Sequence, residues 1–181
     1  MPLSFHRMVN SEADVRDAVA FLTANSFPFH VRQRHTQDSA RDVVAGGRFW
    51  SDESRGYWIE DGSRRIGLAV LDDLAEDAPM FDLRLAEEFR GRGLGVQVLT
   101  ALCTLVFGQF PEPVRFEGQT REDNIAMRKT FLRAGFLKEA HYRLGWPTAD
   151  GTRVASVAYA ILRQDWENNH TTYFEWDDLP A

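Results

Sequence analysis

A glycine-rich turn with two arginines contains the residues best suited to hold a negatively charged ligand. The turn consists of Arg90, Gly91, Arg92, Gly93, Leu94 and Gly95. Glycines allow main-chain N–H groups to approach a ligand closely, and a turn that leads into a helix presents unpaired N–H groups that favour an anion. The two arginines add positive charge beside these groups. The pattern therefore indicates a turn that binds a pyrophosphate.

Two common phosphate-binding motifs differ from this turn. A P-loop ends in Gly-Lys-Ser or Gly-Lys-Thr, and the sequence contains no such ending. The dinucleotide fingerprint requires glycines at its first, third and sixth positions, whereas Gly91 and Gly93 are followed by Val96 at the sixth. The turn therefore matches neither motif. Tight packing between a strand and a helix is the alternative that the residues alone leave open.

A strand before the turn and a helix after it must position these glycines. Apolar and polar residues alternate over residues 81–85, the period-two pattern of a strand with one buried face. Residues 96–106 are apolar around most of a helical circumference, which indicates a helix buried against a sheet.

The rest of the chain predicts strands and helices in one domain over residues 1–166, followed by a tail over residues 167–181. Helices are expected after the caps Ser11 and Thr36, and Asn124 opens a later helix that Gly135 closes. Strands are expected at residues 5–9, 57–60, 65–71, 81–85, 114–118, 141–146 and 154–162.

Composition and charge limit the function classes. The 181 residues are 44% hydrophobic and 27% charged, with a net charge of −6, which argues against nucleic acid as the main partner and fits a cationic acceptor such as an amine. No apolar run is long enough to span a membrane, and the N-terminal residues lack a basic-then-apolar signal. The single cysteine, Cys103, is expected to be a buried, unreactive thiol. We therefore expect a cytoplasmic protein with no membrane or nucleic-acid partner.

The spacing Arg90-x-x-Gly93-x-Gly95 resembles the acetyl-CoA-binding signature of the GNAT superfamily of N-acetyltransferases. The order of the predicted elements is similar to that of the GNAT fold. Three further features resemble its RimJ/RimL-like branch. They are Asn124 at the start of a helix, Gly135-Phe136 at its end, and the ending Tyr159-Ala-Ile-Leu162-Arg-Gln-Asp165-Trp166.

This resemblance implies an α/β (α+β) fold: a mixed, mostly antiparallel sheet of about seven strands, splayed between strands 4 and 5 and flanked by four helices. It also implies acetyl-CoA as co-substrate, with no metal. The pantetheine arm of acetyl-CoA would pair with the backbone of Leu83, Arg84 and Leu85, where one N–H would polarise the thioester carbonyl. The remaining cofactor contacts would come from Arg90, Gly91, Arg92, Gly93, Leu94 and Gly95 at the pyrophosphate, and from Asn124 and Arg128 in the neighbouring helix.

The implied reaction is direct attack of a primary amine, from a protein N-terminus or a small molecule, on the acetyl thioester. A free α-amine has a pKa of about 8, so a carboxylate acting through water suffices as base. Glu117 is the first candidate, with Asp82 and Glu139 as alternatives. For the acid, many family members use a tyrosine where this chain has Phe131, or a serine where it has Met127. Two alternatives are therefore open: Tyr142 is the substitute acid, or the thiolate, whose thiol has a pKa of about 8.5, leaves without an acid.

The sequence leaves several alternatives open. A non-catalytic acyl-CoA-binding or sensing module fits the two missing acid positions, and a different acyl chain is compatible with the motifs. The aromatic residues Phe27, Phe29 and Trp50 are candidates for lining an acceptor pocket, or for plain core. The polar tail fits either a disordered segment or one that packs on the partner subunit of a homodimer. The five histidines lack the spacing of metal ligands.

Overall fold

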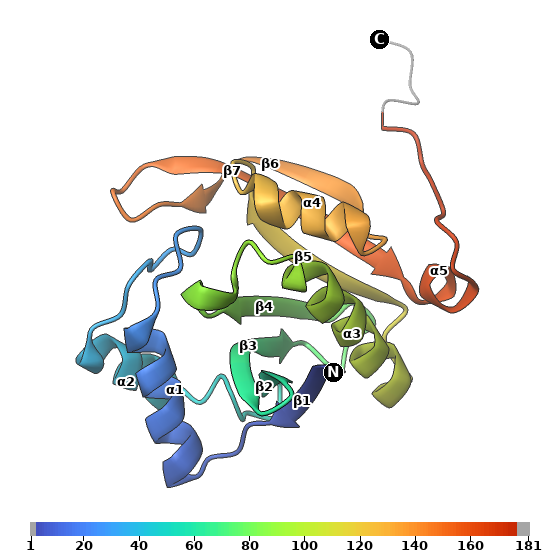
Figure 1. Cartoon of the computed structure of the whole chain (residues 1–181). Helices are drawn as coiled ribbons and strands as arrows, with labels where there is room; N and C mark the ends of the chain where they lie inside the picture. Colours follow the sequence, from blue (N-terminus) through green and yellow to red (C-terminus); the bar gives the residue numbers. More distant parts are fainter. Residues whose placement is uncertain (1–2, 177–181) are drawn as a thin grey trace.

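A computed structural model of the chain describes residues 3–176. The elements in chain order are β1 (Leu3–Arg7), α1 (Glu12–Ala24), α2 (Gln37–Ala45), β2 (Ser54–Asp61), β3 (Arg64–Asp72), β4 (Met80–Leu85), the 3₁₀ turn η1 (Glu87–Phe89), α3 (Leu94–Gln109), β5 (Arg115–Arg121), α4 (Ile125–Arg133), β6 (Leu137–Pro147), β7 (Arg153–Leu162) and α5 (Arg163–Asn168). The predicted mixed α/β architecture is confirmed (Figure 1).

Seven strands form one sheet in the order β1-β2-β3-β4-β5-β7-β6. Neighbouring strands are antiparallel except β4 and β5, which run parallel and pair only at Met80 and Glu117. Beyond this pair the two strands diverge, and Figure 1 shows β5 turning away from β4. The predicted splay between the fourth and fifth strands is therefore present, and it leaves the edge of β4 without a neighbouring strand along residues 81–85.

Aromatic packing explains why the sheet opens at this point. The Phe81 ring lies 5.0 Å from that of Phe116 and 5.8 Å from that of Phe131, measured between centroids. A Cβ on Gly118 would come within 2.7 Å of the Phe81 and Phe131 rings. The rings fill the space beside β5 that a larger side chain would need, so Gly118 is required for this packing.

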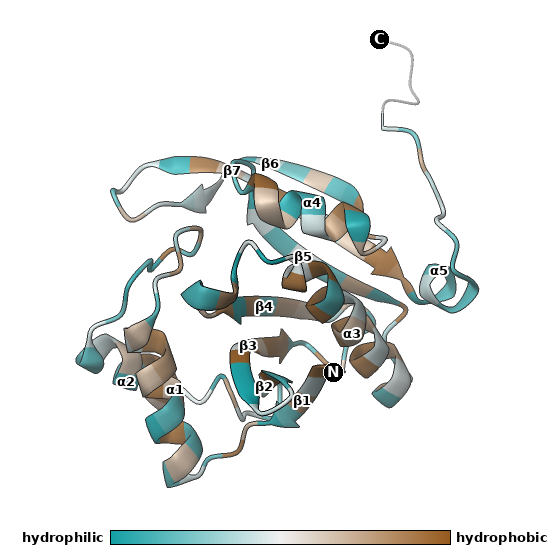
Figure 2. Cartoon of the chain, viewed as in Figure 1, coloured by the Kyte–Doolittle hydropathy of each residue, from teal (hydrophilic) through white to brown (hydrophobic). Residues whose placement is uncertain are grey.

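The sheet has a hydrophobic cluster on each face. Ile59 and Leu71 belong to the cluster that contains the buried side of α3, whereas Trp58 and Leu68 belong to the cluster that contains α1 and α2. Figure 2 shows α3 as a largely hydrophobic helix. Cys103 of α3 is buried, and burial raises the pKa of its thiol to about 12, which confirms the prediction of a buried thiol. Among residues 3–176, no helix has the combination of length and apolar character that crossing a bilayer requires.

The predicted caps are present, but some boundaries differ. Ser11, Thr36 and Asn124 each accept a hydrogen bond from an amide in the first turn of α1, α2 and α4. β1 begins and ends two residues before the predicted range, and β6 begins at Leu137, four residues before His141. β6 is an edge strand with one partner, β7, so its exposed residues lack the alternation that marks a half-buried strand.

The expected count of four helices needs correction, because the described residues contain five α-helices. The additional helix, α5, crosses the predicted domain boundary at residue 166. It is short and polar, so no apolar period marks it. The buried Asp165 accepts hydrogen bonds from the amide and hydroxyl of Thr172, which ties the start of the predicted tail to the domain. Residues 177–181 of the tail lie outside the described part of the chain.

Candidate active site

The glycine turn adopts backbone conformations that require glycine. Gly91 and Gly93 have φ angles of +71° and +79°, and a Cβ at either position would meet no atom within 4 Å. Gly93 is the N-cap of α3 and supplies no capping side chain, so the first amides of this helix keep free donors. Gly95 acts differently, since its Cβ would lie 3.3 Å from Oγ1 of Thr130 and it permits α3 to approach α4 closely.

A cavity of about 400 Å³ lies against this turn, and we call it the turn cavity. Its walls are the turn, the second half of β4, one side of α4 and the loop residues 27–30. The predicted cofactor residues that line it are Leu83, Arg84, Leu85, Arg90, Gly91, Gly93, Leu94, Gly95 and Asn124. Arg92 and Arg128 are not part of this lining. The structure thus brings most of the predicted set together around one space.

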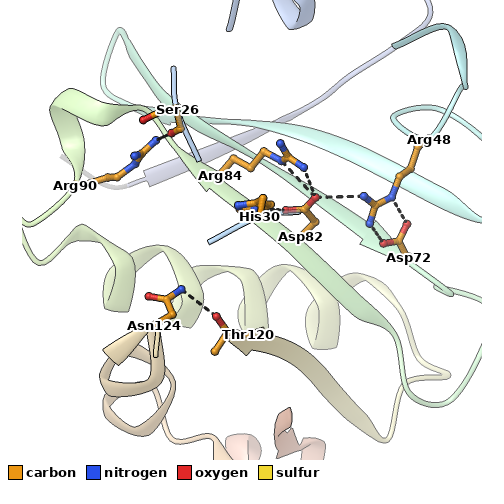
Figure 3. A network of polar contacts seen from close by, with 9 residues as sticks. All are labelled: Ser26, His30, Arg48, Asp72, Asp82, Arg84, Arg90, Thr120 and Asn124. Carbon is orange, nitrogen blue, oxygen red and sulfur yellow. Dashed lines mark hydrogen bonds and ion pairs between the residues drawn. The ribbon is translucent and has the colours of Figure 1, made fainter. Parts of the chain in front are cut away.

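The guanidinium of Arg90 is engaged by the protein itself. Its Nε donates to the Leu85 carbonyl at 2.9 Å, and its Nη2 donates to the carbonyl of Ser26 (Figure 3). The same guanidinium lies 5.5 Å from the centroid of the buried Phe27 ring. Arg90 therefore fastens the loop after α1 to the turn, and its charge does not point freely into the cavity as the sequence suggested.

The cations that helix α4 contributes to the turn cavity differ from the predicted Arg128. Arg128 donates from Nε to the Tyr159 hydroxyl at 3.2 Å and from Nη1 to the Glu122 carbonyl at 2.7 Å. Lys129 and Arg133, one helical turn apart, line the turn cavity instead. Sequence reasoning missed this pair. The sequence does contain a signal for this pair, because Ala126, Lys129, Thr130 and Arg133 are spaced so that they share one face of a helix. All four line the turn cavity.

Asn124 joins β5 to α4. Its Oδ1 accepts from the Met127 amide at 3.2 Å, and its Nδ2 donates to Oγ1 of the buried Thr120 at 2.9 Å (Figure 3). Both ends of the amide are thus used to cap the helix and hold the strand. Because Asn124 holds both Thr120 of β5 and the first turn of α4, it orients that turn relative to the strand. Asn124 also lines the turn cavity.

A second cavity, of about 940 Å³, adjoins the first, and we call it the large cavity. It lies between β4, β5, the end of α2 and the loop residues 29–35, and Trp146 of β6 also lines it. The residues that line both cavities are Phe29, His30, Leu83, Arg84, Asn124 and Met127. Of the aromatic candidates, Phe27 lines only the turn cavity, and Trp50 packs on Phe49 with ring centroids 5.8 Å apart.

An ion network centred on Asp82 of β4 forms one wall of the large cavity (Figure 3). The Asp82 carboxylate lies 2.9 Å from Nε2 of His30, 3.0 Å from Nη2 of Arg84 and 3.2 Å from Nη1 of Arg48. Burial raises the pKa of the Asp82 carboxyl, but the charge of Arg84, the His30 hydrogen bond and Arg48 together hold it well below its usual value. Such a carboxylate is a poor proton acceptor, and its role in this geometry is to orient its neighbours.

The other candidate acid–base residues lie on β5 and β6. Glu117 and Glu139 both contact the guanidinium of Arg115, Glu117 at 2.9 Å. Tyr142, on edge strand β6, is 50% exposed. The structure does not bring Glu117, Glu139 or Tyr142 into the linings of the two cavities described above. Phe131, at the position of the family tyrosine, is fully buried and stacks on Tyr159 with centroids 4.6 Å apart.

Comparison with known families identifies this arrangement. Residues 5–137 match the model of the acetyltransferase (GNAT) domain. The chain belongs to the GNAT acetyltransferase family. The match covers the glycine turn, the diverging strands and the start of β6, so the two cavities are built on elements of a GNAT domain. No curated protein sequence matches the chain.

Solved GNAT structures share this fold. A spermidine N-acetyltransferase from Vibrio cholerae, in complex with CoA and spermine, superposes with a TM-score of 0.77 at 16% identity, covering 92% of this chain and 98% of that one. A chimera of the Vibrio cholerae enzyme SpeG with hSSAT gives the same TM-score and identity over 93% and 99% of the two chains. A probable acetyltransferase gives 0.74 at 18% identity, over 91% and 95%. At these identities the likeness establishes the fold.

Proposed function

We propose that this protein transfers an acetyl group from acetyl-CoA to a primary amine. The observation that carries the proposal is the pair of adjoining cavities at the divergence of β4 and β5, one lined by the glycine turn and the other by charged side chains. One cavity suits a pyrophosphate-bearing donor and the other a separate acceptor. The two substrates would meet at the residues that line both.

The turn cavity has the groups that acetyl-CoA requires. The uncapped start of α3 offers main-chain donors to the pyrophosphate, and Lys129 and Arg133 add positive charge from the facing helix. The edge of β4 along Leu83–Leu85 has no strand beside it on the β5 side, so its main chain is available to pair with the pantetheine amides. A solved GNAT structure of the same fold carries CoA, which supports this assignment.

The large cavity suits a cationic acceptor, because carboxylates outnumber cations in its lining. Five acidic residues face three arginines there: Asp42, Glu53, Asp72, Asp73 and Asp82 against Arg32, Arg48 and Arg84. Arg48 is paired with Asp72 and Asp82, and Arg84 with Asp82, so the carboxylates of Asp42, Glu53 and Asp73 are the ones that would attract an ammonium group. The Vibrio cholerae structure of the same fold holds spermine, which supports a small-molecule amine, whereas a protein N-terminus would present the same reacting group. Asn124 as the cap of α4 and Gly135 at its end support placement in the RimJ/RimL-like branch.

Steady-state assays test the proposal with spermine, spermidine, free amino acids and short unblocked peptides as acceptors. Release of free CoA thiol that depends on one of these amines is expected. Calorimetric titration with acetyl-CoA runs in parallel. Tight binding without thiol release from any amine would contradict the transferase and support a non-catalytic acyl-CoA-binding module. Competition among acyl-CoA thioesters then defines the acyl chain.

A further inference from the structure

We propose that His30, oriented by Asp82, is the base that removes the proton from the acceptor amine. The proposal rests on the proposed function above. His30 lies in the loop between α1 and α2, 52 residues before Asp82 in the chain. The fold brings the two side chains together at the junction of the cavities (Figure 3).

Elimination among the residues common to both cavities singles out His30. Phe29, Leu83 and Met127 have no group that accepts a proton from an ammonium. The guanidinium of Arg84 has donors and no acceptor, and the Asn124 amide is neutral and already bonded at both ends. The imidazole of His30 is the remaining side chain that can take up a proton at the point where donor and acceptor would meet.

The contact with Asp82 selects the tautomer that a base needs. Nε2 of His30 lies 2.9 Å from Oδ1 of Asp82, and an ionised carboxylate only accepts hydrogen bonds. In the neutral imidazole, Nε2 therefore carries the hydrogen and Nδ1 holds the lone pair. Among residues 3–176, Nδ1 has no hydrogen-bond partner. The two side chains are 27% and 15% exposed, so the pair is shielded but open to a substrate.

The loop holds the imidazole ring in place from a second direction. The His30 amide donates to the Phe27 carbonyl at 3.0 Å, and the two rings meet edge to face with centroids 5.6 Å apart. Phe27 is 2% exposed, and the guanidiniums of Arg84 and Arg90 lie over its ring at 4.9 and 5.5 Å. A base fixed in this way needs little reorganisation during the reaction.

Other charged groups surround the pair and shape its response to pH. Arg84 on β4 and Arg48 before β2 both share the Asp82 carboxylate with His30. His35 lies on the same loop and is buried, and its pKa is lowered first by this burial and then by the charge of Arg84. The network keeps Asp82 ionised, so its negative charge remains available to stabilise the imidazolium that forms.

The proposed step moves two protons and one acetyl group. Nδ1 of His30 accepts one proton from the ammonium, and the freed nitrogen lone pair attacks the thioester carbonyl carbon. The C–N bond forms, and the C–S bond then breaks with its electron pair leaving on sulfur. The imidazolium passes its proton to the leaving thiolate, and water takes the second proton from nitrogen. The products are the acetamide, the free CoA thiol and one hydronium ion.

The pH dependence of His30→Gln and His30→Asn tests the base role. The assay measures kcat/KM from pH 6 to pH 10 with spermine, or with the panel amine of highest kcat/KM if that is another. At pH 7 we expect a loss of about 100-fold, the lower end of what general base catalysis contributes. The difference in kcat/KM between the variants and the wild type should become smaller as the pH rises, because the amine then loses its proton to solvent. His30 also lines the turn cavity, so calorimetric affinity for acetyl-CoA is measured alongside, and its loss is expected to be smaller than the loss of kcat/KM.

His6→Gln is the matched control, because His6 also contacts a carboxylate, Glu60 at 3.3 Å, but lies on β1 away from both cavities. It is expected to keep the wild-type profile. The base role of His30 is overturned if both His30 variants keep the wild-type kcat/KM, or if their loss is the same at every pH. In either case, turnover by the wild type still supports the proposed function. Failure of the wild type to acetylate any amine overturns the proposed function, and the base role with it.

Discussion

The two adjoining cavities are built from different parts of the polypeptide. The turn cavity depends on main-chain groups: positive-φ glycines, the open start of α3 and the unpaired edge of β4. The large cavity depends on charged side chains that come from β4, from the loop after α1 and from the segment before β2. A main-chain site follows from local backbone conformation, whereas a side-chain site follows from tertiary packing. The two therefore respond to mutation in different ways.

The largest effect expected on the main-chain side comes from Gly93→Val. A valine at φ +79° is strained, and relief of the strain moves the amides that would hold the pyrophosphate. Charge-assisted hydrogen bonds contribute about 1.5–3 kcal/mol each, so affinity for acetyl-CoA should fall roughly 10- to 150-fold. Isothermal titration measures the change.

Gly151→Val is the matched control for Gly93→Val. Gly151 has a φ of +85° and equally open surroundings, but it lies in the turn between β6 and β7. Both variants should lose about 1–2 kcal/mol of unfolding free energy, and only Gly93→Val should lose affinity. Equal affinities in the two variants would contradict the role of the turn.

Asp82→Asn is the corresponding change on the side-chain side. It leaves His30, Arg48 and Arg84 without their shared carboxylate, so we expect a loss on the order of 2 kcal/mol of unfolding free energy at pH 7. The folded-state pKa of Asp82 is depressed, so its contribution is present above the unfolded pKa of about 3.9 and is lost as the pH falls below it.

Urea denaturation of the wild type and Asp82→Asn at pH 7 and pH 3 measures this contribution. The difference between the two proteins should shrink at pH 3. A difference that is the same at both pH values would show that the Asp82 charge contributes nothing. Acetyl-CoA affinity at pH 7 should change little, because Asp82 lines the large cavity and not the turn cavity.

The contrast between the cavities also explains what the sequence could predict. The turn, the flanking strand and the Asn124 cap are local patterns, and all three are present. The pairing of His30 with Asp82 joins residues 52 positions apart, and no local period connects them. Arg90 illustrates the same limit: its position in the turn was predicted, but its bond to Ser26 depends on how the loop after α1 packs.

Cations on α4 provide a smaller test of where the phosphates would lie. Lys129→Ala and Arg133→Ala should each weaken acetyl-CoA binding by about 1 kcal/mol, roughly fivefold, because both residues are exposed and screened by solvent. Arg128→Ala on the same helix is the control, since its guanidinium bonds to Tyr159 and to the Glu122 carbonyl. It should lower thermal stability and leave affinity unchanged. The reverse pattern would restore Arg128 as the cofactor contact.

The smallest effect is expected for Glu117→Gln. This variant tests whether the place of Glu117 on β5 or the direction of its carboxylate decides its role. Glu117 lies at the apex of the splay, where it pairs with Met80, as its candidacy for base required. Its carboxylate instead contacts Arg115, 2.9 Å away, and Glu117 lines neither of the two cavities. The variant should therefore keep the wild-type dependence of kcat/KM on pH. A loss of kcat/KM confined to low pH would show that Glu117 reaches the amine through water. The base would then be Glu117 on β5, and not His30 in the loop after α1.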